Sequence, residues 1–320
     1  MAARNVCVLG GSGFVGTHLC SALVRAGHLV TVLTRDPERA KHLRVLPAAH
    51  VVRCNVHDDE QLAGSLRDHD AVINLVGILN ETGRDGSGFL QAHTELARKV
   101  VKACRRAHVR RLLQMSGLNA DAEHGPSHYL TSKGKAERIV REAGGPDFLC
   151  TIFQPSVIFG SGDSFINRFA GLLRVMPLCL PLAKPGARLS PVWIEDVVAA
   201  MLKCLEDDAT AGQTYQLCGP QVFTLREIVC FVRDELGLRR AVIGLPDAVS
   251  RLQAAVMDFV PGKPFSTDNY LSLTRDSVCS VDGFGRLGLR PHGMRTIVPR
   301  YLGLEGGRSQ FAAYRRSARR

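Results

Sequence analysis

The chain has 320 residues, of which 45% are hydrophobic and 22% are charged, and its formal net charge is +11. This composition excludes global disorder and predicts one large domain, or one domain with a smaller appendage. No uninterrupted apolar run reaches the ~20 residues that span a bilayer, which excludes a transmembrane segment. The first predicted strand starts too close to Met1 to leave room for a signal or transit peptide. We therefore expect a cytoplasmic protein. The alternatives are peripheral association with the inner membrane and an organelle protein whose presequence has been removed.

The ten cysteines are scattered singly and form no Cys-x-x-Cys pair. This spacing predicts buried thiols in a reducing compartment, and neither a disulfide framework nor a metal site. Much of the excess positive charge lies in residues 105–111 and after residue 307. No nucleic-acid motif accompanies these arginines, so we interpret them as a solvated face and a basic tail, and we expect no nucleic-acid partner.

The first predicted element is an apolar strand, residues 5–9, which runs directly into the glycine-rich stretch Gly10-Gly11-Ser12-Gly13-Phe14-Val15-Gly16. A helix is predicted over residues 17–25. A strand, a glycine turn and a helix in this order are what a dinucleotide site requires. Gly10 would permit the tight turn, Gly13 the close approach of a pyrophosphate, and Gly16 the packing of helix on strand. The amides that open the helix, with Phe14 and Val15 in its first turn, would then face the phosphates.

Further apolar strands alternate with helical patterns through the first half of the chain. The predicted strands are residues 29–33, 50–54, 71–76, 111–115 and 149–153, and a long helix is predicted over 89–107. This alternation predicts an α/β fold, a Rossmann-type doubly wound parallel sheet, over residues 1–153. Any ligand of such a sheet lies along the edge formed by the carboxyl ends of the strands.

Beyond residue 154 proline and glycine interrupt the pattern more often. A helix is predicted to begin in residues 193–198, a strand over 214–217, and a capping box marks another helix at residues 224–227. We expect residues 154–304 to form a smaller α+β lobe for a substrate or partner, with some return to the sheet. Residues 305–320 are predicted to be a basic flexible tail.

The end of the second strand discriminates between the two nicotinamide dinucleotides. An acidic residue there would hold the ribose hydroxyls of NAD, but the chain reads Thr34-Arg35-Asp36. An arginine can pair with a 2′-phosphate, so Arg35 predicts NADP(H), and Asp36 leaves NAD(H) as the alternative.

Two more segments follow strands at the same predicted edge. Asn55 and Val56 come after the third strand, where an adenine could be hydrogen-bonded, and Leu75, Val76 and Gly77 end the fourth. Ordinary strand termination is the alternative interpretation for both segments.

A candidate reaction centre follows in Tyr129-Leu130-Thr131-Ser132-Lys133, which opens a helix. Tyr129 and Lys133 share a helical face at spacing i, i+4, and an ammonium beside a phenol lowers the phenol pKa. Such a tyrosine can exchange a proton with a carbonyl or hydroxyl group during hydride transfer. Ser116, at the end of the fifth strand, could orient the substrate oxygen. A chance surface pair is the alternative interpretation.

These motifs, with Gln154-Pro155-Ser156-Val157-Ile158-Phe159-Gly160, resemble the extended or atypical short-chain dehydrogenase/reductases. Residues 74–79, 191–198 and 266–273 further resemble the nucleotide-binding accessory subunit of respiratory complex I and its bacterial relatives. The resemblance covers about residues 4–303. It implies bound NADPH, a catalytic set of Ser116, Tyr129 and Lys133, and a cofactor site that includes Lys133 and Pro155.

Two functions follow from the resemblance, and the sequence leaves both open. The first is an oxidoreductase or epimerase that acts on a small oxygenated substrate. The second is a non-catalytic NADPH-binding accessory or assembly subunit of a respiratory NADH:quinone oxidoreductase. The chain departs from many epimerase-like members at Gly117-Leu118, where they carry a second serine or threonine.

Overall fold

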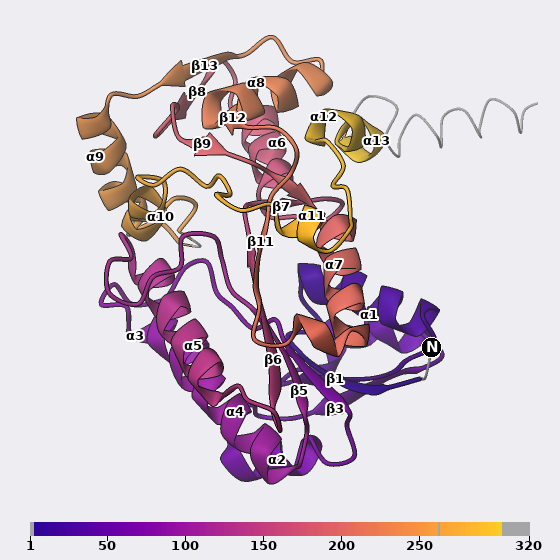
Figure 1. The fold of residues 1–320 in the computed structure, drawn as a ribbon. Helices are drawn as coiled ribbons and strands as arrows, with labels where there is room; N and C mark the ends of the chain where they lie inside the picture. The colour runs from indigo at the N-terminus through magenta and orange to yellow at the C-terminus, as the bar shows by residue number, and fades with distance from the viewer. Residues whose placement is uncertain (1–2, 262, 303–320) are drawn as a thin grey trace, which may run out of the picture. The chain divides into compact units, whose positions relative to one another are not determined.

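The computed structural model describes residues 3–261 and 263–302, so the basic tail predicted at 305–320 lies outside the described residues. The chain divides into two compact units, drawn in Figure 1. The sheet unit comprises residues up to 155, together with 197–217 and 281–289. The second unit comprises residues 156–196, 218–280 and the described residues from 290 onward. In the part of the chain that is described, no helix is both long and apolar enough to cross a membrane.

The sheet unit is built on seven strands in the order β11-β6-β5-β4-β1-β2-β3, and every neighbouring pair is parallel. The strands are β1 (Asn5–Leu9), β2 (Leu29–Thr34), β3 (Ala49–Arg53), β4 (Ala71–Asn74), β5 (Arg111–Met115), β6 (Leu149–Pro155) and β11 (Thr214–Leu217). Every residue of β4 and β5 is buried, as expected for strands covered on both faces. The order reverses at β1, and this is where ligands of doubly wound sheets bind. The predicted fold class is confirmed.

Helices cover the sheet within this unit. They are α1 (Phe14–Arg25), the 3-10 helix η1 (Pro37–Val45), α2 (Asp59–Ser65), α3 (Ser87–Phe89), η2 (Leu90–Glu95), α4 (Leu96–Arg106), α5 (His128–Ala143), η3 (Asp208–Thr210) and α11 (Gly283–Arg286). The helix α7 (Ile194–Glu206) begins in the second unit and continues into this one. Side chains of α2, α4 and α5 share one apolar core with residues of β1, β4, β5 and β6.

The long helix predicted over residues 89–107 is not continuous. Leu90–Glu95 form a π-helical turn, η2, and the α-helix resumes only at Leu96. Single π turns within helices are frequent at functional sites because they re-aim the side chains of one turn. Apolar periodicity cannot reveal such a turn, since one added residue barely disturbs the pattern of a short window.

The second unit contains short paired strands and a helical layer. Its strands are β7 (Ile158–Phe159), β8 (Cys179–Leu182), β9 (Arg188–Leu189), β10 (Val192–Trp193), β12 (Phe223–Thr224) and β13 (Ala241–Gly244). Its helices are α6 (Ile166–Val175), α8 (Leu225–Glu235), α9 (Asp247–Met257), α10 (Thr267–Ser272), α12 (Met294–Ile297) and α13 (Pro299–Leu302). The capping box predicted at Thr224 and Glu227 is present at the start of α8. The apolar core of the second unit contains side chains from α6, α8, β8 and β13.

One expectation about the cysteines is wrong. Cys218 and Cys279 form a disulfide within the second unit, whereas the spacing predicted unpaired thiols throughout. The other eight cysteines are free, and six of them are buried. The pairing was missed because the two residues are 61 positions apart and are brought together only by the tertiary fold.

Candidate active site

The glycine-rich turn connects β1 to α1 and leaves the first amides of the helix available. Gly13 is the N-cap, it supplies no side-chain hydrogen bond, and the first turn, with Phe14 and Val15, has no acidic residue. At Gly16 a β-carbon would lie 2.4 Å from the carbonyl oxygen of Gly10, so only glycine lets the helix approach this closely. A helix start with unpaired amides and no competing carboxylate suits an anion such as a diphosphate.

The same turn lies against the end of β4. Gly10 has a φ of +79°, and a β-carbon there would come within 3.0 Å of the Val76 backbone nitrogen. The Leu75 amide donates to the Leu9 carbonyl at 3.0 Å, which extends the contact between the two strands. Leu75, Val76 and Gly77 therefore follow β4 at the same sheet edge as the glycine turn.

At the end of β2 the acidic residue is engaged in local structure. Asp36 caps η1 by accepting a hydrogen bond from the Glu38 amide at 3.1 Å, and it pairs with Arg39 at 3.6 Å. Arg35 is exposed, and its carbonyl accepts a hydrogen bond from the Arg53 side chain at 3.4 Å. Two arginines from adjacent strand ends thus lie together at this edge.

The residues predicted after β3 form the turn into α2. The Asn55 side chain accepts a hydrogen bond from the His57 amide at 3.1 Å, and its own amide donates to the Gln61 side chain. Val56 is buried. Asn55 is exposed, but its side-chain oxygen already terminates the turn. This contact is compatible with either interpretation, so the adenine-binding role of Asn55 and Val56 stays a prediction.

Tyr129 and Lys133 lie on α5, close to the ends of β4 and β5. The phenol oxygen of Tyr129 is 3.2 Å from where a Gly117 β-carbon would be, so this glycine leaves space beside the phenol. The Lys133 ammonium donates to the Met115 carbonyl at 3.3 Å. It lies 3.1 Å from the position that a β-carbon would have at Gly77. It also lies 6.0 Å from the centre of the Tyr129 ring. The structure therefore brings these two residues to the edge that carries the glycine turn.

Ser116 is placed differently. Its hydroxyl is buried and, among the described residues, has no partner at good hydrogen-bonding geometry. It nevertheless lies close enough to Glu137 to oppose the rise that burial causes in the pKa of that carboxyl group. Glu137 is two helical turns beyond Tyr129, and the residue beside the phenol is Gly117. Ser116 is thus near Glu137, without a hydrogen bond to it among the described residues.

Burial controls the charges around Lys133. It lowers the pKa of Lys133 to about 8, while the nearby Glu137 carboxylate opposes the change. Glu137 accepts two hydrogen bonds from Gln154, at 2.9 and 3.0 Å. Sequence reasoning missed Glu137, although its position four residues after Lys133 on one helical face was a usable signal.

His93 is a second residue that sequence reasoning did not place in the site. It lies in the π turn η2, and its Nε2 accepts a hydrogen bond from the Ile78 amide at 3.1 Å. Burial, assisted by the Lys133 charge, lowers the His93 pKa to about 2, so the ring is neutral and Nδ1 donates to Ser132 at 2.8 Å. The Ser132 hydroxyl in turn donates to the Tyr129 carbonyl. His93 therefore ties the loop after β4 to the start of α5.

Pro155 ends β6, beside the end of β5. Its carbonyl accepts a hydrogen bond from the Leu118 amide at 2.9 Å, and it is paired with Leu217 of β11. It thus lies at the carboxyl end of the sheet together with the ends of β1, β4 and β5. No contact of Pro155 distinguishes a cofactor-binding role from a structural one.

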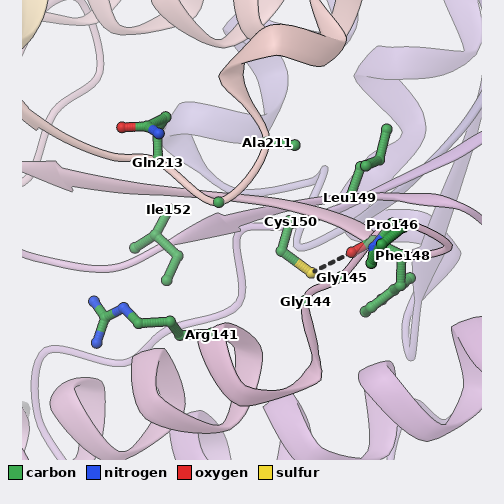
Figure 2. A pocket seen from close by; sticks show the side chains of 11 residues that line it. Arg141, Gly144, Gly145, Pro146, Phe148, Leu149, Cys150, Ile152, Ala211 and Gln213 are labelled. Carbon is green, nitrogen blue, oxygen red and sulfur yellow. Dashed lines mark hydrogen bonds between the residues drawn. The ribbon is translucent and has the colours of Figure 1, made fainter.

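A cavity of about 310 Å³ lies elsewhere in the sheet unit (Figure 2). Its walls are formed by Arg141, Gly144, Gly145, Pro146, Phe148, Leu149, Cys150, Ile152, Ala211, Gly212 and Gln213. These residues gather around the beginning of β6, at the opposite end from Pro155. None of the predicted site residues lines this cavity, so it does not belong to the candidate active site.

Known proteins resemble the chain in sequence and in fold. Residues 10–160 match the model of an NAD(P)H-binding family. The structure of MoeE5 in complex with UDP-glucose and NAD superposes with a TM-score of 0.74 at 18% identity, and covers 96% of this chain and 99% of that one. A likeness at this identity supports the fold of the chain.

Three relatives span most of the sequence. Subunit 9 of the NADH dehydrogenase (ubiquinone) 1 alpha subcomplex from Arabidopsis thaliana is 30% identical over 92% of this chain and 76% of its own. A 4-hydroxy-2-methyl-3-oxo-4-farnesyl-3,4-dihydroquinoline-1-oxide ketoreductase from Stigmatella aurantiaca is 26% identical over 77% and 78%. A ceramide reductase from Caulobacter vibrioides is 26% identical over 79% and 77%. The chain therefore contains a domain of an NAD(P)H-binding family, has a short-chain dehydrogenase/reductase-like fold, and belongs to the family of the subunit 9 proteins.

Proposed function

We propose that the protein is an NADP(H)-dependent reductase of a carbonyl group in a lipophilic substrate. The observation that carries the proposal is the meeting of Tyr129 and Lys133 with the ends of β4 and β5, next to a glycine turn that accommodates a diphosphate. Two relatives are named for reductions of a farnesylated ketone and of ceramide, which supports a lipophilic carbonyl compound.

The residues of the site fit a dinucleotide. Gly10, Gly13 and Gly16 make a cradle that β-carbons would fill, and Gly77 would admit a ribose next to the Lys133 ammonium. When bound, the reduced nicotinamide supplies a hydride. Tyr129 would donate its phenolic proton to the carbonyl oxygen as the hydride arrives at carbon. Lys133 would hold the ribose hydroxyls, and its positive charge would stabilise the phenolate that remains.

Ser116 has a weaker place in this proposal. An oxygen bound between Tyr129 and a serine would need the serine hydroxyl to face the phenol. The Ser116 hydroxyl has no hydrogen-bond partner among the described residues, and Gly117 is the residue beside the phenol. We therefore assign proton transfer to Tyr129 and retain Ser116 only as a predicted member of the set.

The preference for NADP(H) is supported by the end of β2. Thr34 gives no carboxylate at the strand end, Asp36 is committed to capping η1, and Arg35 and Arg53 lie together there. We expect Arg35→Ala to weaken NADPH binding about tenfold or more, as loss of one charged phosphate contact does, and to leave NADH affinity within twofold. Isothermal titration with both nucleotides tests this. Equal losses for the two nucleotides would contradict a 2′-phosphate contact.

The proposed chemistry is tested with Tyr129→Phe. General acid catalysis contributes about 10²–10⁴-fold, so turnover of long-chain and prenylated ketones should fall at least a hundredfold. NADPH affinity should stay near the wild-type value because the phenol does not hold the dinucleotide. Tyr215→Phe, which changes a tyrosine of β11, is the matched control. Undiminished turnover in Tyr129→Phe would refute the assignment.

A second function is favoured by the 30% identity to the Arabidopsis thaliana subunit. In this case the chain would bind NADPH without turnover, as an accessory or assembly subunit of a respiratory NADH:quinone oxidoreductase, associated peripherally with the inner membrane. The ketone screen and a pull-down from solubilised membranes separate the two functions. Persistent NADPH binding, no turnover and stable recovery of respiratory subunits would support the accessory role over a free cytoplasmic enzyme.

A further inference from the structure

The helix α9 of the second unit presents an unusual apolar surface to solvent. Val249, Leu252, Val256 and Phe259 recur at helical spacing along α9 and just beyond it, and their exposed fractions are 44%, 64%, 58% and 74%. At 100° per residue Val249, Leu252 and Val256 fall within one arc of about 60° on the helix, and Phe259 follows its last turn. Isolated exposed apolar side chains are ordinary, but a continuous stripe of large ones marks a surface that is covered by a partner.

Side chains on the opposite side of α9 are buried or contact other residues of the second unit. Ser250 and Ala254 are buried. Asp247 accepts a hydrogen bond from Tyr270 of α10 at 2.8 Å and pairs with Lys184 at 2.6 Å. These contacts fix how the helix is rotated, so the apolar stripe cannot turn inward without breaking an ion pair and a hydrogen bond.

The charges around the stripe are not symmetric. The two carboxylates at the ends of the helix have inner partners, since Asp247 contacts Lys184 and Asp258 accepts hydrogen bonds from Thr267. Arg251 is exposed on the same helix, outside the stripe, and its charge acts on Asp247. A helix with one exposed apolar arc, whose charged groups lie outside that arc, is the pattern of helices that lie in the interface of a bilayer.

Exposed apolar residues also occur on the strand that precedes α9 and on the loop paired with it. β13 runs directly into α9, and Ile243 on this strand is 49% exposed. The first residue of β13, Ala241, donates its amide to Leu178, which is 79% exposed and follows Val175, which is 81% exposed. Figure 1 shows β13 beside β8 and leading to α9.

Basic side chains also accompany β13. Arg240 immediately precedes β13, and its guanidinium donates to the Arg174 carbonyl at 3.4 Å. Arg174 and Arg239 are exposed. Exposed Val175 and Leu178 thus lie near a group of arginines at the beginning of β13, and this group is the complement of an anionic lipid surface.

We propose that α9 and the loop around Leu178 dock the protein on the surface of a bilayer that contains anionic lipids. The docking inference stands on the second unit alone and does not require the catalytic proposal. If both hold, the carbonyl substrate is taken from the membrane in which it dissolves. A second copy of the chain is disfavoured as the occupant because the arginines of two identical surfaces would repel each other.

The test is co-sedimentation of the full chain with vesicles of phosphatidylcholine, alone or with about one third phosphatidylglycerol. We expect binding to the mixed vesicles and a loss of at least about tenfold in affinity for the double variant Leu252→Glu/Phe259→Glu, because two apolar side chains can no longer be buried. Val45→Glu, which changes an 80% exposed valine of the sheet unit, is the matched control and should bind as the wild type does. Thermal melts check that each variant is folded.

A second readout does not depend on a disruptive change. Phe259→Trp should show a blue-shifted emission when mixed vesicles are added, relative to the wild-type signal from Trp193. Unchanged vesicle binding by the double variant, or no shift in Phe259→Trp, overturns the proposal. Concentration-dependent dimers that the double variant dissociates, without vesicle binding, would assign the surface to a second copy and overturn it equally. None of these outcomes depends on NADPH binding or turnover, so failure of the proposed function is recognised separately.

Discussion

At the scale of single residues, Lys133 is a buried amine whose positive charge is unfavourable in the folded protein. The ammonium is buried between α5 and the loop after β4, and its polar contacts there are a backbone carbonyl and a nearby carboxylate. Burial disfavours the charged form, which lowers the pKa from the ordinary 10.5 to about 8. A folded protein holds such a group only because the rest of the structure compensates for it, and buried ionisable groups of this kind cluster at functional sites.

The consequence is a defined dependence of stability on pH. The Lys133 pKa is lower in the folded than in the unfolded chain, so its penalty is complete below pH 8. Between pH 8 and 10.5 the unfolded chain binds more protons, and stability rises with pH. We expect Lys133→Met to increase the free energy of unfolding of the nucleotide-free protein by about 1–3 kcal/mol below pH 8.

Denaturant titrations at pH 7 and pH 10 measure this difference, which should shrink at the higher pH. Lys135→Met, a change at a half-exposed lysine of the same helix, should move stability little at either pH. A destabilised Lys133→Met protein would show that the lysine is held in place by contacts worth more than its desolvation cost.

At the scale of elements, the turn between β1 and α1 depends on a single glycine contact. A β-carbon at Gly16 would meet the backbone of Gly10 and Gly11 at 2.4 Å, and a backbone neighbour cannot rotate away. We expect Gly16→Ala to destabilise the sheet unit by about 2 kcal/mol or more, as overpacking does, and to abolish NADPH binding. Gly64→Ala is the matched control, because nothing lies within 4 Å of its β-carbon position inside α2.

The control should behave in the opposite sense. Alanine in an open helical position stabilises by about 0.5–1 kcal/mol relative to glycine, so Gly64→Ala should unfold at a slightly higher temperature. Thermal melts and NADPH titrations of both variants make the comparison. A Gly16→Ala protein that is as stable as the wild type would show that the turn can relax.

The elements that could be predicted from the sequence are those determined by residues close together in the chain. Strand, glycine turn and helix are encoded in consecutive residues, and the i, i+4 spacing places Tyr129 and Lys133 on one face of α5. The direction of the Ser116 hydroxyl could not be predicted, because a residue at a strand end turns according to its neighbours in space. The pairing of Glu137 with Gln154 was missed for the same reason, since the two residues meet only in the folded structure. The π turn around His93 was missed because one added residue barely disturbs the apolar pattern of the helix.

At the scale of the whole molecule, the disulfide closes a long excursion of the chain. The chain leaves the sheet unit after Leu217 and returns to it at Val281, and Cys218 and Cys279 lie just inside these two crossings. All residues between the cysteines belong to the second unit. Both cysteines are half-buried, so a reductant can reach the bond more readily than it could in a core.

Closing this loop should make the fold sensitive to the redox state. In the chain-entropy model a cross-link over this separation reduces the conformational entropy of the unfolded chain. This reduction increases the free energy of unfolding by roughly 4 kcal/mol. We expect reduction, or Cys218→Ser, to lower the melting temperature of the second unit by several degrees, with little effect on NADPH affinity, which depends on the sheet unit. Differential scanning calorimetry with and without reductant measures the shift.

Peptide mapping without reduction should recover the Cys218–Cys279 link. Cys230→Ser, at a free and half-buried cysteine of the same unit, is the control and should melt as the wild type does. A missing link in the peptide map, or a melting temperature indifferent to reduction, would show that the chain works with ten free thiols, as the spacing of its cysteines first predicted.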